Sequence, residues 1–466
     1  MHSPESRADR TGAADPWVRN LVVATFGTFT TIVGMTMLIP FLPVYIRALG
    51  VTDDAAVVTW SAVCFGATFL VAAVTAPLWG WMGDRWGRKS MLVRSSLGMA
   101  VAIGITGLAG DVWWLLAFRV LTGLLGGFAS GASILVADQT PPGRRAFALG
   151  VLTSGNMAGS LLGPVLGGIL PESIGPRACF AVVGGLIFVA FLGVVLFMRN
   201  PPALAEAPPG VPAKAPAATS AVPGGGTQVV DRAANQPTAQ LPRVALPVVL
   251  TVLVAVSGLI TFAQLAVEPF ITVYMGELLT NAGAITKAGA TAGAEATGAS
   301  GATAALGAGA VGSAGLANPT LWGGIALAAT AAGTMVAGPF LGRAADRYGN
   351  TRMLIWSLLA GAVVSLVQPL TGSVWVFTGL RFVLGLAMGG LMPALTAGIR
   401  DMLPANRVGR VLGLTVAAQH AGRVFGPVLA AVVANLWGMP AALVASGLVL
   451  AIAAVAVWGV RPAAAR

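Results

Sequence analysis

The stretch "GWMGDRWGRKS", Gly80 to Ser90, places one acidic and three basic side chains together in a chain of which only 9% is charged. A second stretch, "GRAADRYGN" at 342–350, repeats its Gly, Asp, Arg and Gly at the same spacing. Long runs without charge flank both stretches. The pattern predicts short polar loops between apolar segments, in an arrangement that occurs twice along the chain.

The apolar segments are too numerous for a water-soluble core. Hydrophobic residues make up 56% of the 466 positions, which is above the usual share in a soluble domain. A helix needs roughly 20 mostly apolar residues to cross a bilayer, and twelve such runs can be placed. We therefore predict an all-α membrane protein with twelve transmembrane helices in two six-helix repeats. The runs begin near Asn20, Thr59, Ser90, Val112, Ala146, Arg177, Val244, Thr320, Thr351, Val374, Val408 and Pro440.

The basic residues predict the orientation in the membrane. A formal net charge of +11 would suggest nucleic acid as a partner of a soluble chain. Here 21 of the 27 Lys and Arg residues fall in the termini and alternate loops on one side of the spans, and 3 fall in the opposite loops. Loops rich in Lys and Arg stay in the cytoplasm. We expect a multi-pass inner (plasma) membrane protein with both termini cytoplasmic and no nucleic-acid partner.

Composition divides the chain into domains. Residues 201–242 are rich in Pro, Ala and Gly and lack hydrophobic periodicity, which is typical of a flexible linker. Six predicted spans precede this linker and six follow it. The expected parts are a cytoplasmic tail at 1–19, an N-terminal bundle at 20–200, the cytoplasmic linker at 201–242, a C-terminal bundle at 243–461 with a low-complexity outer loop at about 280–318, and a cytoplasmic tail at 462–466.

The two halves repeat each other. Nine pairs of identical residues lie 262 positions apart, and a Gly-Pro pair, Gly163-Pro164 and Gly426-Pro427, lies 263 apart. Parallel six-helix repeats of this kind relate the two halves of many secondary transporters. The nine pairs are Trp60 and Trp322, Pro77 and Pro339, Gly80 and Gly342, Asp84 and Asp346, Arg85 and Arg347, Gly87 and Gly349, Trp113 and Trp375, Arg119 and Arg381, and Gly123 and Gly385.

The first charged loop, G-x-x-x-D-R-x-G-R-K, resembles the signature loop of the major facilitator superfamily. Glycine permits close helix approach and a tight turn, an aspartate can cap a neighbouring helix, and an arginine can pair with an acid. The resemblance implies that these residues form a breakable latch on the cytoplasmic side, which Asp138 joins; a positive-inside anchor without a switching role is the alternative. The latch residues are Gly80, Asp84, Arg85, Gly87, Arg88, Asp138, Asp346 and Arg347.

Spans four and five extend the resemblance. Glycine at every fourth position leaves one helix face bare for close packing, and a proline bends the helix. The order G-x-x-x-G-P-x-x-G-G in span five resembles the antiporter motif of drug efflux members. With "FRVLTGLLGG" in span four, it makes the N-terminal half most similar to the twelve-span drug:proton antiporters of the MdtG type. The motif residues of span five are Gly155, Gly159, Gly163, Pro164, Gly167 and Gly168.

Proton coupling needs a group whose protonation changes between states. A charge inside the membrane is costly unless it is paired or hydrated, so Arg119 is a candidate, with helix bracing as the alternative. Glu268 in span seven can carry a proton, recognise a cation, or lie at the interface near the outer end. His420 and Arg423 share one face of span eleven. No acid occupies the centre of span one.

Aromatic and Met side chains on spans one, two, seven and eight are candidates for the lining of an apolar substrate cavity, and core or lipid contact is the alternative for each. The cavity candidates are Met37, Phe41, Tyr45, Phe65, Phe262, Phe270 and Tyr274.

The sequence as a whole predicts a proton-coupled efflux transporter for small amphipathic compounds, acting by alternating access as a monomer. No cofactor, metal ion or catalytic step is expected, because no nucleophile, ligand cluster or nucleotide-binding loop is visible. A narrow-specificity exporter or a sugar or metabolite symporter of the same superfamily is the runner-up. A membrane enzyme or a receptor on the same fold are the other classes considered.

Overall fold

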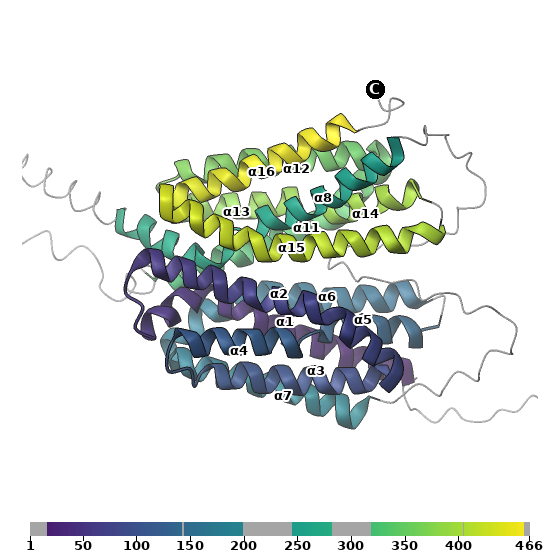
Figure 1. Ribbon diagram of the computed structural model, residues 1–466, viewed down its shortest axis with the longest axis horizontal. Helices are drawn as coiled ribbons and strands as arrows, with labels where there is room; N and C mark the ends of the chain where they lie inside the picture. Colours follow the sequence, from purple (N-terminus) through teal and green to yellow (C-terminus); the bar gives the residue numbers. More distant parts are fainter. Residues whose placement is uncertain (1–15, 142–143, 199–244, 282–317, 404, 461–466) are drawn as a thin grey trace, which may run out of the picture.

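The computed structural model describes residues 16–141, 144–198, 245–281, 318–403 and 405–460. Those residues form two helical bundles that lie against each other (Figure 1). The purple-to-blue bundle is the N-terminal half and the teal-to-yellow bundle is the C-terminal half. The predicted linker and most of the predicted outer loop fall outside the described residues.

The N-terminal half runs through seven helices. They are α1 (Pro16–Ala48), α2 (Asp54–Trp86), α3 (Arg88–Thr106), α4 (Val112–Leu125), α5 (Phe128–Gln139), α6 (Arg145–Ile174) and α7 (Pro176–Phe197). In the C-terminal half the corresponding elements are α8 (Ala245–Leu265), the 3-10 turn η2 (Glu268–Phe270), a helix over 271–281, α11 (Pro319–Tyr348), α12 (Asn350–Val367), the 3-10 turn η3 (Gln368–Leu370), α13 (Val374–Met388), α14 (Leu391–Asp401), α15 (Ala405–Trp437) and α16 (Met439–Gly459).

The all-helical membrane fold predicted from the sequence is confirmed. Eleven described segments are long and apolar enough to cross a bilayer. The span predicted to begin near Ser90 is α3, a helix of 19 residues whose first half carries Arg88, Lys89 and Arg94. Those charges keep it below the composition expected of a span, yet it packs between α4 and α7 like its neighbours.

Three predicted spans are broken. Span four is divided between α4 and α5 at Gly126 and Gly127, and span ten between α13 and α14 at Gly389 and Gly390. Span seven is divided at η2, where Pro269 cannot donate a helical hydrogen bond. A broken helix leaves backbone groups free at membrane depth, which is tolerated where they are buried in protein or line a cavity.

The repeat is visible in side-chain geometry. Trp60 and Trp113 meet edge to face with their ring centroids 4.7 Å apart, and their repeat mates Trp322 and Trp375 do the same at 4.4 Å. These equivalent contacts confirm that the offset of 262 marks two copies of one helix bundle.

Candidate functional site

The first charged loop is a tight turn between two helices. Gly87 ends α2 and begins α3 with φ of +89°, and its N–H donates to the carbonyl of Gly83 at 3.1 Å. Its repeat mate Gly349 has φ of +92° between α11 and α12. A residue with a Cβ adopts this conformation only with strain, which explains the glycine at both positions.

The predicted latch residues lie at one end of the molecule. We call it the charged end and define it by Arg85, Arg88 and Arg347, which lie at the turns between α2 and α3 and between α11 and α12. The guanidinium of Arg88 lies 3.8 Å from the carboxylate of Asp138 at the end of α5, within the N-terminal half. Arg85 and Arg347 are exposed and lie near aromatic rings of their own helices, 5.7 Å from Trp81 and 5.4 Å from Tyr348.

The close approach predicted at Gly80 is not present in this conformation, and the predicted role of the latch aspartates stays a prediction. Gly80 was expected to permit close helix approach, but an added Cβ at Gly80 or at Gly342 would meet no described atom within 4 Å. These helix faces are therefore not packed against a neighbour in this conformation. Asp84 and Asp346 lie on α2 and α11, and their side chains fall outside the described part of the chain.

The two halves meet tightly at the other end, which we call the opposite end. The amide of Asn435 on α15 donates to the hydroxyl of Thr59 at 2.8 Å and to the carbonyl of Ala55 at 3.2 Å, both on α2. Thr272 donates its hydroxyl hydrogen to the carbonyl of Pro40 on α1. These hydrogen bonds join residues from different halves, and they tie the bundles together at this end.

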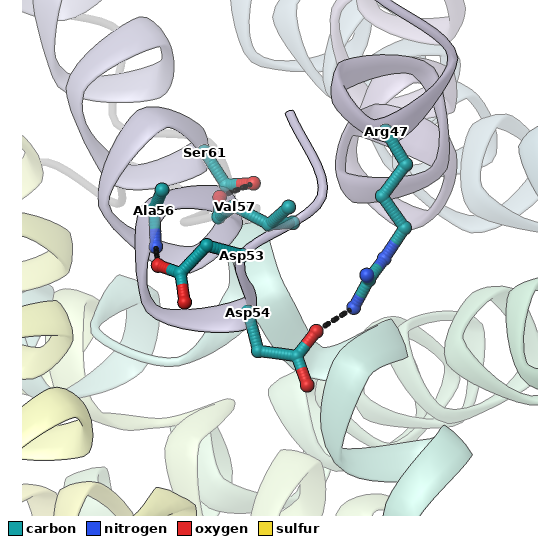
Figure 2. A network of polar contacts seen from close by, with 6 residues as sticks. All are labelled: Arg47, Asp53, Asp54, Ala56, Val57 and Ser61. Atoms are coloured by element: carbon teal, nitrogen blue, oxygen red, sulfur yellow. Dashed lines mark hydrogen bonds and ion pairs between the residues drawn. The ribbon is translucent and has the colours of Figure 1, made fainter. Parts of the chain in front are cut away.

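A turn at the opposite end is fixed by its own polar network. Arg47 at the end of α1 pairs with Asp54 at the start of α2, as Figure 2 shows. Asp53 caps α2 by accepting a hydrogen bond from the backbone N–H of Ala56 at 2.7 Å. This network holds the ends of α1 and α2 together, and α2 there carries the residues that contact Asn435.

The glycine motif of span five is a contact surface for α1. A Cβ added at Gly155 would lie 2.7 Å from the side chain of Thr25, and one at Gly159 would lie 2.8 Å from the carbonyl oxygen of Phe29. Gly163 and Gly167 meet the next turns of α1 in the same way. Gly168 faces the C-terminal half instead, with Leu321 of α11 at 3.0 Å. The spacing predicted from the sequence therefore lets two backbones approach closely.

Glu268 lies in the break of span seven. Its position in η2 is deeper than the outer end where the sequence suggested it, because the helix resumes over 271–281. Glu268 interacts electrostatically with Arg381 of α13 and with Arg423 of α15. Among the described residues, it is the one acid that lies more than two helical turns from either end of a candidate span.

The two arginines that interact with Glu268 lie at least partly inside the protein. Arg381 is buried at 4% exposure and stacks on Phe377 at 5.2 Å, and its Nε and Nη2 have no partner in the part of the chain described. Arg423 is half-buried, and it interacts with His420 one turn away. The structure thus gathers Glu268, Arg381, Arg423 and His420 in the C-terminal half.

Arg119, the repeat mate of Arg381, has a different environment. It is buried at 5% exposure, and its Nη2 donates to the hydroxyl of Thr106 at 3.2 Å. Its electrostatic partners are Cys64 and Tyr45, whereas Arg381 has Glu268 and Tyr274. Each half therefore brings an arginine near a tyrosine, Arg119 near Tyr45 and Arg381 near Tyr274. The acid near the arginine, Glu268, is found in the C-terminal half alone among these electrostatic partners.

A sequence signal for this cluster exists but is easily missed. "IPFLPVY" at 39–45 and "EPFITVY" at 268–274 align with an offset of 229, not 262, because the loops between the spans differ in length. In this alignment Tyr45 matches Tyr274, and Ile39 takes the place of Glu268. Glu268 is therefore recognised as an acid without a counterpart in the N-terminal half only when the spans are aligned one by one.

The predicted cavity residues are mostly buried. Phe41 and Tyr45 pack on Phe180 inside the N-terminal half, at 5.4 and 5.0 Å between ring centroids, and the Tyr45 hydroxyl donates to the carbonyl of Thr106 at 2.9 Å. These two belong to the core and not to a cavity wall. Met37 is also part of this core, and Phe262 approaches α15 through its backbone. Phe65, Phe270 and Tyr274 belong to an apolar cluster that both halves share.

An open apolar groove that the sequence did not indicate lies on the outer surface where α1 and α6 meet, and its lining includes the exposed side chains of Val22 and Phe26. Its volume is about 330 Å³, and its lining is apolar. The lining residues are Val22, Thr25, Phe26, Phe29, Val151 and Gly155. Within the described ranges, no three His, Cys, Asp or Glu side chains gather closely enough to hold a metal ion.

Comparison with known proteins agrees with this architecture. The family model of the Major Facilitator Superfamily matches residues 24–333 and 318–466. A Multidrug resistance protein MdtG from Enterobacter lignolyticus is 30% identical over 93% of this chain and 90% of its own length. The MdtG of Serratia proteamaculans is 30% identical over 95% of this chain and 93% of its own.

A solved structure shows the same fold. The crystal structure of a bacterial homologue of the human lysosomal transporter Spinster, described as inward-facing and unoccupied, superposes with a TM-score of 0.67. It is 15% identical and covers 96% of this chain and 98% of its own. The chain is a multi-pass transporter and not an enzyme, and it belongs to the major facilitator superfamily.

Proposed function

We propose that the protein exports small amphipathic drugs or toxic compounds across the bacterial inner membrane in exchange for protons, by alternating access. The charged end faces the cytoplasm in this proposal, since loops rich in Lys and Arg are retained there. The opposite end then faces outward. The observation that carries the proposal is that hydrogen bonds tie the two halves together at the opposite end, while at the charged end an added Cβ at Gly80 or Gly342 would meet no described atom within 4 Å.

Alternating access requires the reverse arrangement to exist as well. In the outward-open conformation the latch residues of the charged end would close against the other half. The Arg88–Asp138 pair lies within one half, so it positions the loop in both conformations. Helices of the other half would then approach Gly80 and Gly342 closely. This approach accounts for glycine at two positions that have free space around them in this structure.

Glu268 is the best placed proton carrier. It lies in a helix break at membrane depth and faces two arginines, so its charge can be stabilised when it is ionised. Its element, η2, packs against α1 and α2 of the other half. A change of protonation there can therefore act directly on the contact between the halves.

The relatives named multidrug resistance proteins support amphipathic compounds as substrates. Two arginines against one acid in the central cluster disfavour a site that selects cations through Glu268 alone. We propose that the transporter works as a monomer, with the substrate passing between its own two halves.

The experiment is accumulation of a panel of fluorescent amphipathic dyes in cells that overproduce the protein. Accumulation should fall below that of cells with an empty vector, and a protonophore should remove the difference. Uptake that an inward proton gradient accelerates would contradict export and favour the symporter of the same superfamily.

A further inference from the structure

One side chain lies against a ring of the other half and interacts electrostatically with the central acid. Arg423 projects from α15, and its guanidinium carbon lies 5.5 Å from the centroid of the Phe69 ring on α2. It also interacts electrostatically with Glu268. The helices are close at this level, because a Cβ added at Gly66 of α2 would lie 3.2 Å from the carbonyl oxygen of Val424. Arg423 is therefore acted on from two sides, by the charge of the acid in the C-terminal half and by a ring of the N-terminal half.

Glu268 itself lies beside the contact that closes the opposite end. Four residues further on, Thr272 binds the carbonyl of Pro40. Phe270, Tyr274 and Phe65 form one apolar cluster across the two halves. The other groups that act on this acid are Arg381, which interacts with Tyr274, and His420, which interacts with Arg423.

We propose that Arg423 is a positioning residue that couples the protonation of Glu268 to closure of the opposite end. The inference rests on the proposed function, in which Glu268 exchanges a proton. Ionised Glu268 attracts Arg423, and this attraction is strong where the dielectric constant is low. When Glu268 is neutral, this attraction is absent and Arg423 can lie over the face of the Phe69 ring. That cation–π contact joins the two halves.

The direction of this coupling suits exchange. A proton that enters from outside binds the Glu268 carboxylate, and the freed Arg423 then stabilises the closed opposite end. The carrier now opens to the cytoplasm and releases the proton there. The ionised acid draws Arg423 back, the contact with Phe69 weakens, and the opposite end can open with substrate bound.

The test follows the distance between the halves. Spin labels are placed at Leu108→Cys and Leu370→Cys, which are exposed repeat mates at the opposite end, after Cys64→Ala and Cys179→Ala. Pulsed electron paramagnetic resonance in lipid nanodiscs between pH 5 and pH 8 gives the ratio of closed to open molecules. The closed population should grow as the pH falls, and Glu268→Gln should stay closed at every pH.

Removal of either member of the cation–π pair should weaken this response. Phe69→Leu and Arg423→Gln should each lower the closed-to-open ratio at pH 5 by about 2- to 30-fold. The double variant should lower it no further, and Phe69→Tyr, which keeps the ring, should retain the response. Trp79→Leu is the matched control, because its ring lies 3.5 Å from the guanidinium of Arg94 within the N-terminal half and outside the apolar cluster that both halves share, and it should keep the response to pH.

Two failures can be told apart. If Phe69→Leu and Arg423→Gln respond to pH like the unmodified protein while Glu268→Gln does not, Arg423 is not the coupling residue and the proton site stands. If the unmodified protein and Glu268→Gln show the same distances at every pH, the proton site itself is wrong, and the inference fails with it.

Discussion

Gly324 on α11 is a direct test of how the two halves separate. A Cβ at this position would lie 3.2 Å from the carbonyl carbon of Pro164 and 3.3 Å from the Cα of Gly168, with the Pro164 oxygen nearer still. Carbon atoms that are not bonded prefer about 3.5–4.0 Å, and backbone atoms of α6 cannot rotate aside. Gly324→Ala should therefore force α6 and α11 apart by roughly half an ångström or more.

Gly324→Ala should raise the free energy of the conformation that is closed at the opposite end, because the clash exists only there. Overpacking of this kind costs about 1–3 kcal/mol, which corresponds to about a 5- to 150-fold shift of the equilibrium toward molecules open at the opposite end. Folding of each half should be preserved, because the clash is between halves and alanine favours a helix more than glycine does.

The assay is alkylation of a cysteine inside the closed contact. Val58 is 3% exposed in the apolar cluster that both halves share, so Val58→Cys should react slowly with a membrane-impermeant maleimide applied from outside. Gly324→Ala should speed this reaction, with Cys64→Ala and Cys179→Ala as the background. Gly338→Ala on the same helix is the control, because its Cβ would meet no described atom within 4 Å. Equal rates in the two variants would refute separation of the halves at this contact.

The remaining predictions concern the latch, the coupling residues and the linker. Asp84→Asn should abolish efflux at equal expression and insertion, as measured by dye accumulation and by the amount of protein in the membrane; normal efflux would reduce the loop to an anchor. Arg119→Ala should stop or uncouple transport, because it removes a buried charge that acts on neighbouring groups, and substrate-driven proton movement at the unmodified rate would argue against this. Glu268→Gln should stop export of neutral as well as cationic dyes, whereas loss of cationic dyes alone would make Glu268 a recognition residue. Shortening the linker at 201–242 moderately should leave efflux intact, since its composition cannot form a core, and loss of efflux with correct insertion would assign it a site.

Much of the architecture could be predicted from local chemistry. The backbone at Gly87 and Gly349 has a positive φ, which a residue with a Cβ adopts only with strain. The positions of the two charged turns could therefore be predicted from the sequence. The equivalent tryptophan contacts in the two halves follow from the offset of 262 residues, which stays constant over several helices. The glycine stripe of α6 predicted close packing, and a spacing of four places each glycine on the same helix face.

The central cluster could not be predicted in the same way. The electrostatic interactions of Glu268 with Arg381 and Arg423 join η2, α13 and α15. The order of these elements around the bundle cannot be predicted from the sequence of any one of them. The position of Glu268 depended on where span seven is broken, which only the three-dimensional path of η2 revealed. Phe41 and Tyr45 suggested a cavity wall by type, but which face of α1 points to the core depends on the packing of α7.

The central claim is that export is an exchange with protons carried by Glu268. Everted membrane vesicles acidified inside by respiration, with a pH-sensitive dye, measure this directly. Adding an exported compound should release protons from vesicles that contain the unmodified protein and should release none from vesicles with Glu268→Gln. Transport of the same compound into these vesicles without any proton release, or at an unchanged rate after the pH gradient is collapsed, would contradict the account.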